Sequence, residues 1–593
     1  MGVSIITVFL YVLYGYGIGS GISKFLPMSK EPVEQHLMRF GIGLGVIPFI
    51  AMLLNLLHIP LHFTIFLVLA ILGIILNYKA LIKIQQHPSL FAVGAFILFF
   101  FSLFIYTTGA FSYPYLEDDD PWAIAKTVAY VAQEKTGFVD EGVFVSNYID
   151  PYPPAYFMFL GLLYQTSPDL QWTLKFFNAL TISLAILFFF FLVRILLQSS
   201  KKAFYATLVL AMVPAFLSHF IWAIAFTLPL FMIAMYCFLT GNKRWYLIGA
   251  IVFAGIIMTH PSTGPILGIL IASYWGVKAL VKKPDPWLAA AGITAVILSM
   301  IWWMPIMIDW GGPSGILEHF GGASADNLKG SATRVYTFKD FFVATPGNLI
   351  NNPIGFGIIP MILMLIGLIY TIITKKKLWQ WVILAWFVFT FLAVNGERIG
   401  VAFFSFRMWM ILALPFSILA AEGMHILISS VKRFNRLLPI AAFILLLVGI
   451  WGTAGYYKYR VNTDPWPSGG WLGPSPGSLQ ALMFMKDNFP ADTKVFEASM
   501  EFIYGVNMQS CDWCEDESHL KENFHTLPVE EIYSILKRNG YEYLFFDGSL
   551  YAKWNDPEET TTRLNEIAQG PFDPVYQSQL QGQPTPDMIF RVR

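Results

Sequence analysis

The sequence has few charged residues and very few cysteines. Only 13% of its 593 residues are charged, whereas a soluble domain carries about 25%, so an ordinary soluble protein is excluded. The formal net charge is zero, which gives no sign of a nucleic-acid partner. Three cysteines are too few for a disulfide-dense scaffold. The first apolar run, residues 3–22, lacks a basic leader and a small-residue cleavage site, so we expect a retained helix rather than a cleaved signal peptide.

Long apolar runs stand where the charge is missing. Hydrophobic residues make up 56% of the chain, and a helix needs roughly 20 apolar residues to cross a bilayer. About fourteen segments meet this criterion, which predicts a polytopic α-helical membrane protein. The segments are residues 3–22, 40–58, 61–77, 90–110, 172–197, 203–219, 221–240, 245–259, 262–281, 287–308, 353–374, 378–395, 402–428 and 437–456.

Basic residues occur in every second connection between these segments, and the positive-inside rule makes such connections cytoplasmic. The basic residues are Lys24, Lys30, Arg39, Lys79, Lys83, Arg194, Lys201, Lys202, Lys243, Arg244, Lys278, Lys282, Lys283, Lys375, Lys376, Lys377, Lys432, Arg433 and Arg436. The first large loop, 111–171, and the second loop, 309–352, are then external. We therefore predict a multi-pass protein of the cell membrane, with a membrane domain over 1–456 and an extracytoplasmic domain over 457–593.

The residues after the last span have a soluble composition. Helical patterns over 478–488 and 529–539 alternate with strand patterns over 494–498 and 541–546. Such an alternation predicts a small α/β domain.

Four residues of this domain have the side chains of a zinc site. Cys511, Cys514, His519 and His525 follow one another closely, and thiolate and imidazole are the usual ligands of zinc. A local disulfide in an oxidising compartment, or two free thiols, are the alternatives that the sequence leaves open.

Four consecutive carboxylates, Glu117 to Asp120, stand in the first large loop directly before Pro121. Carboxylates packed this closely repel one another unless a cation, a proton or a substrate offsets them. The proline opens an amphipathic pattern over 121–136, which predicts a helix at the outer surface. An aspartate directly before such a helix is also a good N-cap, so Asp120 has both a structural and a chemical interpretation, and Glu117 is interpreted as a solvated flank.

The segment Asp119 to Trp122, followed by the helical residues 128–137, resembles the Asp-Pro-aromatic motif of oligosaccharyltransferase catalytic subunits. The segments Tyr152 to Pro154 and Arg407 to Gly423 are similar to stretches of the wider GT-C superfamily of integral-membrane glycosyltransferases. This resemblance implies a GT-C-like membrane domain in the cell envelope. It also implies transfer of a sugar from a polyprenyl-phosphate-linked donor to a glycan, lipid or protein acceptor outside the membrane.

Two features depart from the oligosaccharyltransferase pattern. The Trp-Trp-Asp-Tyr-Gly signature is absent, and its nearest counterpart, Ile301 to Trp303, lies in a predicted span. The acidic loop follows about four predicted spans, whereas GT-C enzymes usually place it after the first. These departures favour transfer of a hexosyl or pentosyl unit over transfer of a whole oligosaccharide to asparagine.

Such a transfer needs a base for the acceptor hydroxyl and positive charge for the departing phosphate. Asp118, Asp119 and Asp120 are the predicted catalytic carboxylates, and Asp118 and Asp120 are also candidate ligands of a magnesium or manganese ion. We expect the catalytic base to be Asp118 or Asp119 before Asp120, because Asp120 can instead serve as the helix N-cap. Asp120 is kept because it matches the motif.

Four further residues are predicted to bind substrate or phosphate. Arg407 lies about one turn inside a span, where a charge is costly and needs a partner; that partner is either a phosphate or an acidic loop. His219 and His260 stand at the outer ends of predicted spans, where an ordinary helix-end histidine is the alternative. Asp150 precedes a proline, and a turn aspartate is its alternative.

Two other functions compete with sugar transfer. A transporter or flippase of lipid-linked or envelope glycans would carry charges within its spans and have related halves, but here the charges cluster at the faces. A non-catalytic envelope assembly protein on the same scaffold is the third possibility. Removal of the carboxylates of Asp118 and Asp119 distinguishes an enzyme from both.

Overall fold

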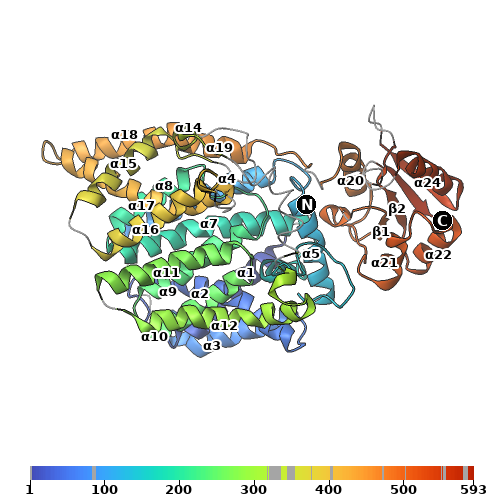
Figure 1. Ribbon diagram of the computed structural model, residues 1–593, viewed down its shortest axis with the longest axis horizontal. Coiled ribbons are helices and arrows are strands. Elements are labelled where there is room, and N and C mark those ends of the chain that lie inside the picture. Colours follow the sequence, from blue (N-terminus) through green and yellow to red (C-terminus); the bar gives the residue numbers. More distant parts are fainter. Residues whose placement is uncertain are drawn as a thin grey trace.

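The protein has two parts (Figure 1): a bundle of long helices, and a small α/β domain, formed by the C-terminal residues, that packs against one end of the bundle. The computed structural model describes residues 3–82, 89–282, 284–316, 318, 335–343, 354–374, 377–400, 405–469, 473–500, 502–548, 551, 556–578 and 585–593. Most of the predicted second loop, 309–352, lies outside the described residues.

Each predicted span contains a helix, and eight helices of the described residues are long and apolar enough to cross a membrane. The protein is therefore a multi-pass membrane protein. The eight are α1 (Ile5–Ser23), α2 (Pro32–Leu56), α4 (Leu90–Ala110), α7 (Leu170–Leu197), α11 (Thr263–Val281), α12 (Pro286–Asp309), α17 (Ser405–Val431) and the run Leu438–Thr463. Shorter helices of the bundle are α3 (Phe63–Ile82), α8 (Ser200–Met212), α9 (Ile224–Leu239), α10 (Lys243–Ile257), α14 (Phe338–Phe342), α15 (Ile358–Ile373), α16 (Leu378–Val394) and the short η1 (Gly396–Ile399).

The span predicted over 203–219 is wrong over 213–219, because α8 ends at Met212. Pro214 lies two positions later, and a proline disfavours helical geometry in the residue before it, here Val213. Residues 213–223 are buried without forming a helix. Irregular backbone at membrane depth needs internal hydrogen-bond partners.

Side chains from three other helices supply those partners. Lys458 Nζ donates to the carbonyls of Val213 and Phe216, Tyr106 Oη to that of Leu217, and Asn178 Nδ2 to those of His219 and Phe220. The unwound segment is thus held by tertiary contacts, and it carries His219 at its centre.

The last helix of the bundle is longer than predicted. A π-helical turn, η2 (Trp451–Gly455), joins α18 (Leu438–Ile450) to α19 (Tyr456–Thr463). The helix therefore continues past residue 456, and its last turns bring Lys458 and Asn462 against the unwound segment.

Two helices between α4 and α7 are not spans. α6 (Ala155–Tyr164) begins directly after Pro154 and is largely buried. α5 (Asp120–Glu134) confirms the helix predicted after the acidic run, but the C-terminal domain covers it rather than leaving it at an exposed surface. Its N-terminus therefore lies where the two parts of the molecule meet (Figure 1).

The C-terminal domain is built on a mixed four-stranded sheet with the order β1-β2-β4-β3. β1 (Val495–Glu497) pairs parallel with β2 (Tyr543–Phe546), while β4 (Met588–Val592) pairs antiparallel with both β2 and β3 (Phe572–Gln577). The α/β prediction is confirmed, and Gly540, with φ of 73°, ends the helix before β2. The helical elements are α20 (Pro476–Asn488), η3 (Ile503–Val506), α21 (Glu515–Glu522), α22 (Val529–Arg538) and α24 (Pro557–Gln569).

Candidate functional site

The acidic run turns sharply before it enters α5. Asp118 has a left-handed backbone with φ of 54°, and its N–H donates to the carbonyl of Pro467 at 3.0 Å. Asp119 is the N-cap of α5, and its carboxylate accepts the N–H of Asp120 at 2.9 Å. The capping duty expected of Asp120 therefore belongs to Asp119, and Asp120 is the first helical residue, with its carboxyl directed to other partners.

Asp120 meets residues from two other segments of the chain. The Tyr148 hydroxyl donates a hydrogen bond to Asp120 Oδ1. Burial, and then the neighbouring Asp119, raise the pKa of the Asp120 carboxyl to about 6, against lowering contributions from Tyr148 and Arg407. Because Arg407 comes from the first turn of α17, residues nearly three hundred positions apart share one electrostatic environment. The carboxyl is mostly ionised at neutral pH and has a basicity suited to accepting a proton there.

Asp118 is more strongly perturbed than Asp120. Burial is the largest cause, followed by the charges of Asp119, Asp120 and Glu117, and together they raise the pKa of its carboxyl to about 7. The run thus cannot hold all of its charges at neutral pH, in agreement with the repulsion predicted for four adjacent carboxylates.

His260 joins the same side of the run. Its ring packs edge-on against Tyr152, with the ring centres 5.6 Å apart. Its Nδ1 accepts from the N–H groups of Ser262 and Thr263, at 3.3 and 3.2 Å, where α11 begins. Burial, and then Arg407, hold the pKa of the imidazole well below its usual range. A neutral His260 has a proton on Nε2 to donate, but it does not carry the positive charge expected of a phosphate ligand.

His219 belongs to a second cluster at the opposite end of the run. Tyr113 Oη lies 2.9 Å from His219 Nε2 and donates to Glu117 Oε2 at 3.0 Å. The His219 ring stacks on Trp466 at 3.8 Å, and its Nδ1 is 3.3 Å from Asn462 Oδ1. His219 is completely buried. Because it lies in the unwound segment and contacts Tyr113, which in turn bonds to Glu117, it links that segment to the acidic loop.

Glu117 is also completely buried, which corrects its interpretation as a solvated flank. Its Oε1 accepts from the N–H of Ile221 at 3.4 Å, and burial raises the pKa of its carboxyl. Lys175 closes the cluster, because its Nζ donates to the Tyr113 carbonyl at 2.9 Å and lies 4.0 Å from the centre of the Tyr113 ring. Glu117 therefore faces a different set of partners from Asp120.

Asp150 lies near the site but has a contact of its own. Its Oδ1 accepts from the Trp310 indole at 2.8 Å, and the peptide bond to Pro151 is cis. The side chain of this loop that donates to Asp120 belongs to Tyr148. Sequence analysis did not identify Tyr148 or Lys175, because neither residue belongs to a motif. The segment beginning at Tyr152, which is similar to GT-C enzymes, was the one sequence signal that pointed to this loop.

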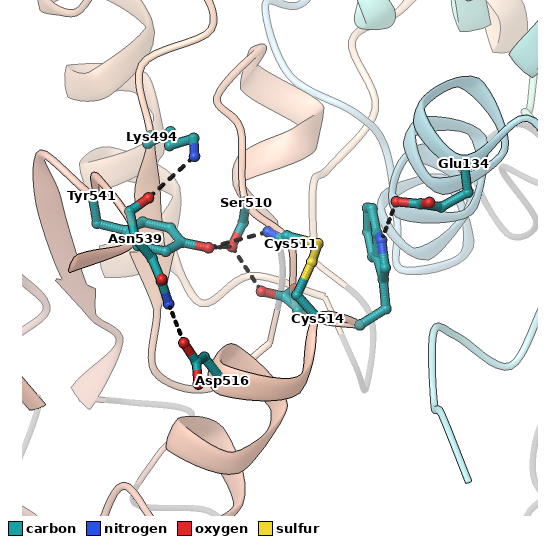
Figure 2. The surroundings of a disulfide bond; sticks show 10 residues. Glu134, Lys494, Ser510, Cys511, Cys514, Asp516, Asn539 and Tyr541 are labelled. Carbon is teal, nitrogen blue, oxygen red and sulfur yellow. Dashed lines mark hydrogen bonds between the residues drawn. A yellow bond between two sulfur atoms is a disulfide. The ribbon is translucent and has the colours of Figure 1, made fainter. Parts of the chain in front are cut away.

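The four residues of the predicted zinc site do not assemble into a metal site. Cys511 and Cys514 form a disulfide (Figure 2), so they offer no thiolates. His519 and His525 are exposed. The disulfide alternative is therefore the correct one. Among the residues that the structure describes, no group of three or more His, Cys, Asp or Glu side chains is placed to hold a metal ion.

Comparisons with known proteins give a fold but no close relative. No family model matches the sequence, and no curated protein matches it. The crystal structure of ArnT from Cupriavidus metallidurans bound to undecaprenyl phosphate superposes with a TM-score of 0.52 at 12% identity, covering 85% of this chain and 97% of that one. The apo structure of the same protein covers the same shares at 12% identity with a TM-score of 0.48. The first of these similarities shows the fold alone: the chain has a fold like that of ArnT, which agrees with the predicted GT-C-like fold class.

Proposed function

We propose that this protein is a glycosyltransferase that moves a hexosyl or pentosyl unit from a polyprenyl-phosphate-linked donor to an acceptor at the outer face of the membrane. The observation that carries the proposal is the half-buried Asp120 carboxyl, with a pKa raised to about 6, in the same electrostatic environment as the Arg407 guanidinium. A base and a cation so arranged match what sugar transfer from a lipid phosphate requires. The GT-C fold, shared with a protein that binds undecaprenyl phosphate, supports the class of donor.

The proposed reaction is one displacement at the anomeric carbon. Asp120 accepts the proton of the acceptor hydroxyl while its oxygen forms the new bond to the sugar. The bond between the anomeric carbon and the phosphate oxygen breaks, and its electron pair leaves with the polyprenyl phosphate. Tyr148 orients Asp120 through its hydrogen bond, and Asp119 fixes the first turn of α5 on which Asp120 stands.

Arg407 is proposed to bind the phosphate of the donor. A guanidinium matches phosphate oxygens with two parallel N–H groups, and it stabilises the charge that grows as the sugar departs. His260 serves as a neutral hydrogen-bond donor in the same region. Asp118, which titrates near neutrality, is proposed to line the acceptor side of the run.

The site is proposed to face outward. α10 begins at Lys243 and Arg244 and ends before His260, so the site lies at the end of the helix opposite its basic residues. The positive-inside rule puts such basic ends in the cytoplasm. The acidic run and the C-terminal domain would then be extracytoplasmic, where a glycan, lipid or protein acceptor is reached.

A divalent cation remains a separate proposal. Carboxylate oxygens suit magnesium, and Asp118 and Asp120 are the residues that would contact it. No group of three ligand side chains assembles within the described residues, so no step above depends on the ion. Loss of turnover on chelation, restored by magnesium or manganese, would assign it a role.

The test uses the purified full chain in proteoliposomes with undecaprenyl phosphate charged with a radiolabelled hexose or pentose. Wild type should transfer label to a water-soluble or lipid acceptor and release undecaprenyl phosphate. The single variant Asp120→Asn should lose about 10²- to 10⁴-fold of this activity, and the double variant Asp118→Asn/Asp119→Asn should lose a smaller part of it. Equal product from wild type and both variants would reject the enzyme. Accumulation of unreacted donor in the opposite leaflet of sealed vesicles would identify a flippase instead.

A further inference from the structure

One stripe of α5 is occupied by residues that contact the C-terminal domain. Trp122, Lys126, Tyr130 and Glu134 follow one another at intervals of four, so they lie along one side of the helix. Each of the four touches the domain. The stripe runs from the first turn of the helix, beside Asp120, to its last residue.

The first contact is made by an aromatic ring. Trp122 packs edge-on against Phe502, with the ring centres 5.7 Å apart. A Cβ at Gly505 would lie 2.5 Å from the Trp122 ring, so the domain approaches the helix closely enough to require glycine there. The N-terminal turn of α5 is therefore in tight contact with η3.

The other three contacts converge on two consecutive residues of the domain. Lys126 Nζ lies 3.6 Å from Asp512 Oδ2, and both side chains are buried. The Tyr130 ring stands edge-on to Trp513 with the centres 5.2 Å apart. The Trp513 indole N–H donates to Glu134 Oε1 at 2.9 Å (Figure 2).

Asp512 and Trp513 are the two residues enclosed by the Cys511–Cys514 disulfide. We call residues 511–514 the disulfide loop. The loop is anchored on its other side, because the Tyr541 hydroxyl accepts the N–H of Cys511 at 3.1 Å (Figure 2). A disulfide across four residues removes conformations in which Asp512 and Trp513 point away from α5.

We propose that the disulfide loop is a positioning element of the active site: by holding the Lys126–Glu134 side of α5, it fixes the register of the helix and thereby the place of Asp120 relative to Arg407. A helix moves as a rigid rod over this length, so a shift at Glu134 is transmitted to the first turn. A 1 Å displacement of a reacting group is enough to lower a rate about a hundredfold. The effect on turnover rests on the function proposed above, whereas the docking of α5 does not.

The first arm of the test measures docking without any substrate. Hydrogen–deuterium exchange is followed in peptides covering 120–134 of the reconstituted full chain. Cys511→Ser/Cys514→Ser should raise exchange in α5 about tenfold, the scale of a local opening, and a thiol reductant should do the same to wild type. Reductant should change nothing further in the double serine variant, and Gln133→Ala, an exposed residue of the same helix, should match wild type. Unchanged protection of α5 would overturn the proposal.

The second arm separates positioning from general stability. Trp513→Phe keeps an aromatic ring against Tyr130 and removes the N–H that Glu134 accepts. Lys126→Met removes the cation that α5 places against Asp512 and leaves Lys521 of the domain, 3.9 Å from Asp512 Oδ2, in place. Both should lower kcat by about tenfold or more and leave the donor KM unchanged, because Arg407 stands on α17. Lys126→Arg should restore most of kcat. Faster exchange in α5 with unchanged kcat would overturn the positioning role. Absence of turnover in wild type itself would reject the proposed function, while the exchange arm would still decide the docking.

Discussion

The two ends of the acidic run face opposite kinds of surroundings. Glu117 is completely buried and bonded to Tyr113 and to the backbone of Ile221. Asp120 is half-buried, accepts one hydrogen bond from Tyr148, and is influenced by the cation of Arg407. One end therefore has the contacts of a structural element, and the other brings together the carboxyl and the guanidinium that the proposed reaction needs.

The backbone marks the boundary between the two ends. Asp118 takes a left-handed conformation and is tied to Pro467, which separates a buried glutamate from the capped start of α5. Left-handed aspartate is uncommon and costs energy unless the surrounding contacts hold it. The comparison predicts that Glu117 matters for folding and Asp120 for turnover.

Asp120→Asn is the sharpest way to test this comparison. The substitution keeps the size and a hydrogen-bond acceptor for Tyr148 but removes the base, so turnover of the lipid-linked donor should fall about 10²- to 10⁴-fold. The thermal midpoint should stay close to that of wild type. Glu117→Gln is the matched control, and we expect it to lose stability by about 1–3 kcal/mol while turnover changes only a few-fold. The reverse pattern would show that the roles of the two ends are exchanged.

Arg407→Gln should produce the next largest effect. A charge-assisted hydrogen bond to phosphate contributes about 1.5–3 kcal/mol, which predicts a loss of kcat/KM for the donor of roughly 10- to 150-fold. Arg407→Lys keeps the positive charge but lacks the planar guanidinium, so its kcat/KM for the donor should lie between those of wild type and Arg407→Gln. Inhibition by free undecaprenyl phosphate gives an independent measure, since its affinity should drop in parallel. A loss confined to the acceptor KM would contradict the assignment.

The pH dependence of turnover separates the two ends by their titration. Asp120 must be ionised to accept a proton, and its pKa is raised to about 6, so log(kcat/KM) should fall with unit slope as the pH decreases below about 6. Glu117→Gln should keep this limb, because Glu117 is not the base. Asp120→Asn should lose it from the residual activity. A profile that is flat between pH 5 and pH 7 would rule out Asp120 as the base.

The helices were predictable because hydropathy is a local property. The apolar run 90–110 became α4, Leu90–Ala110, since a span needs only its own residues to satisfy its backbone. The end of α8 was not predicted, although Pro214 was a local signal. A non-helical segment at this depth also needs hydrogen-bond donors for its backbone carbonyls. Lys458 and Asn178 supply them, and both lie far from Pro214 in the sequence.

The site was predictable only in part, for the same reason. Asp120 and Arg407 stood in recognisable segments, but the motif did not distinguish the cap from the helical residue beside it. The burial of Glu117 depends on Tyr113 and on a segment a hundred residues later. The side-chain types of residues 511–525 suit zinc and a disulfide equally, and only the folded geometry brings Cys511 onto Cys514.

Asp118→Asn should have the smallest effect of these substitutions, and the effect is on stability. It tests the residue at which the buried end of the acidic run meets the start of α5. The folded protein raises the pKa of this carboxyl from 3.8 to about 7, so the protonated form is favoured and the stability associated with it is lost as the pH rises through 7. Asparagine does not titrate and accepts a left-handed backbone. The variant should therefore equal wild type in stability below about pH 4 and exceed it above pH 7, by about 1–2 kcal/mol because the partly exposed site is screened by solvent. Thermal midpoints measured at pH 4 and pH 8 decide the matter. A gain of the same size at both would reflect backbone preference alone, whereas a gain that grows with pH identifies the ionised Asp118 carboxylate, disfavoured by burial and then by its charged neighbours, as the cost that the acidic run carries at its centre.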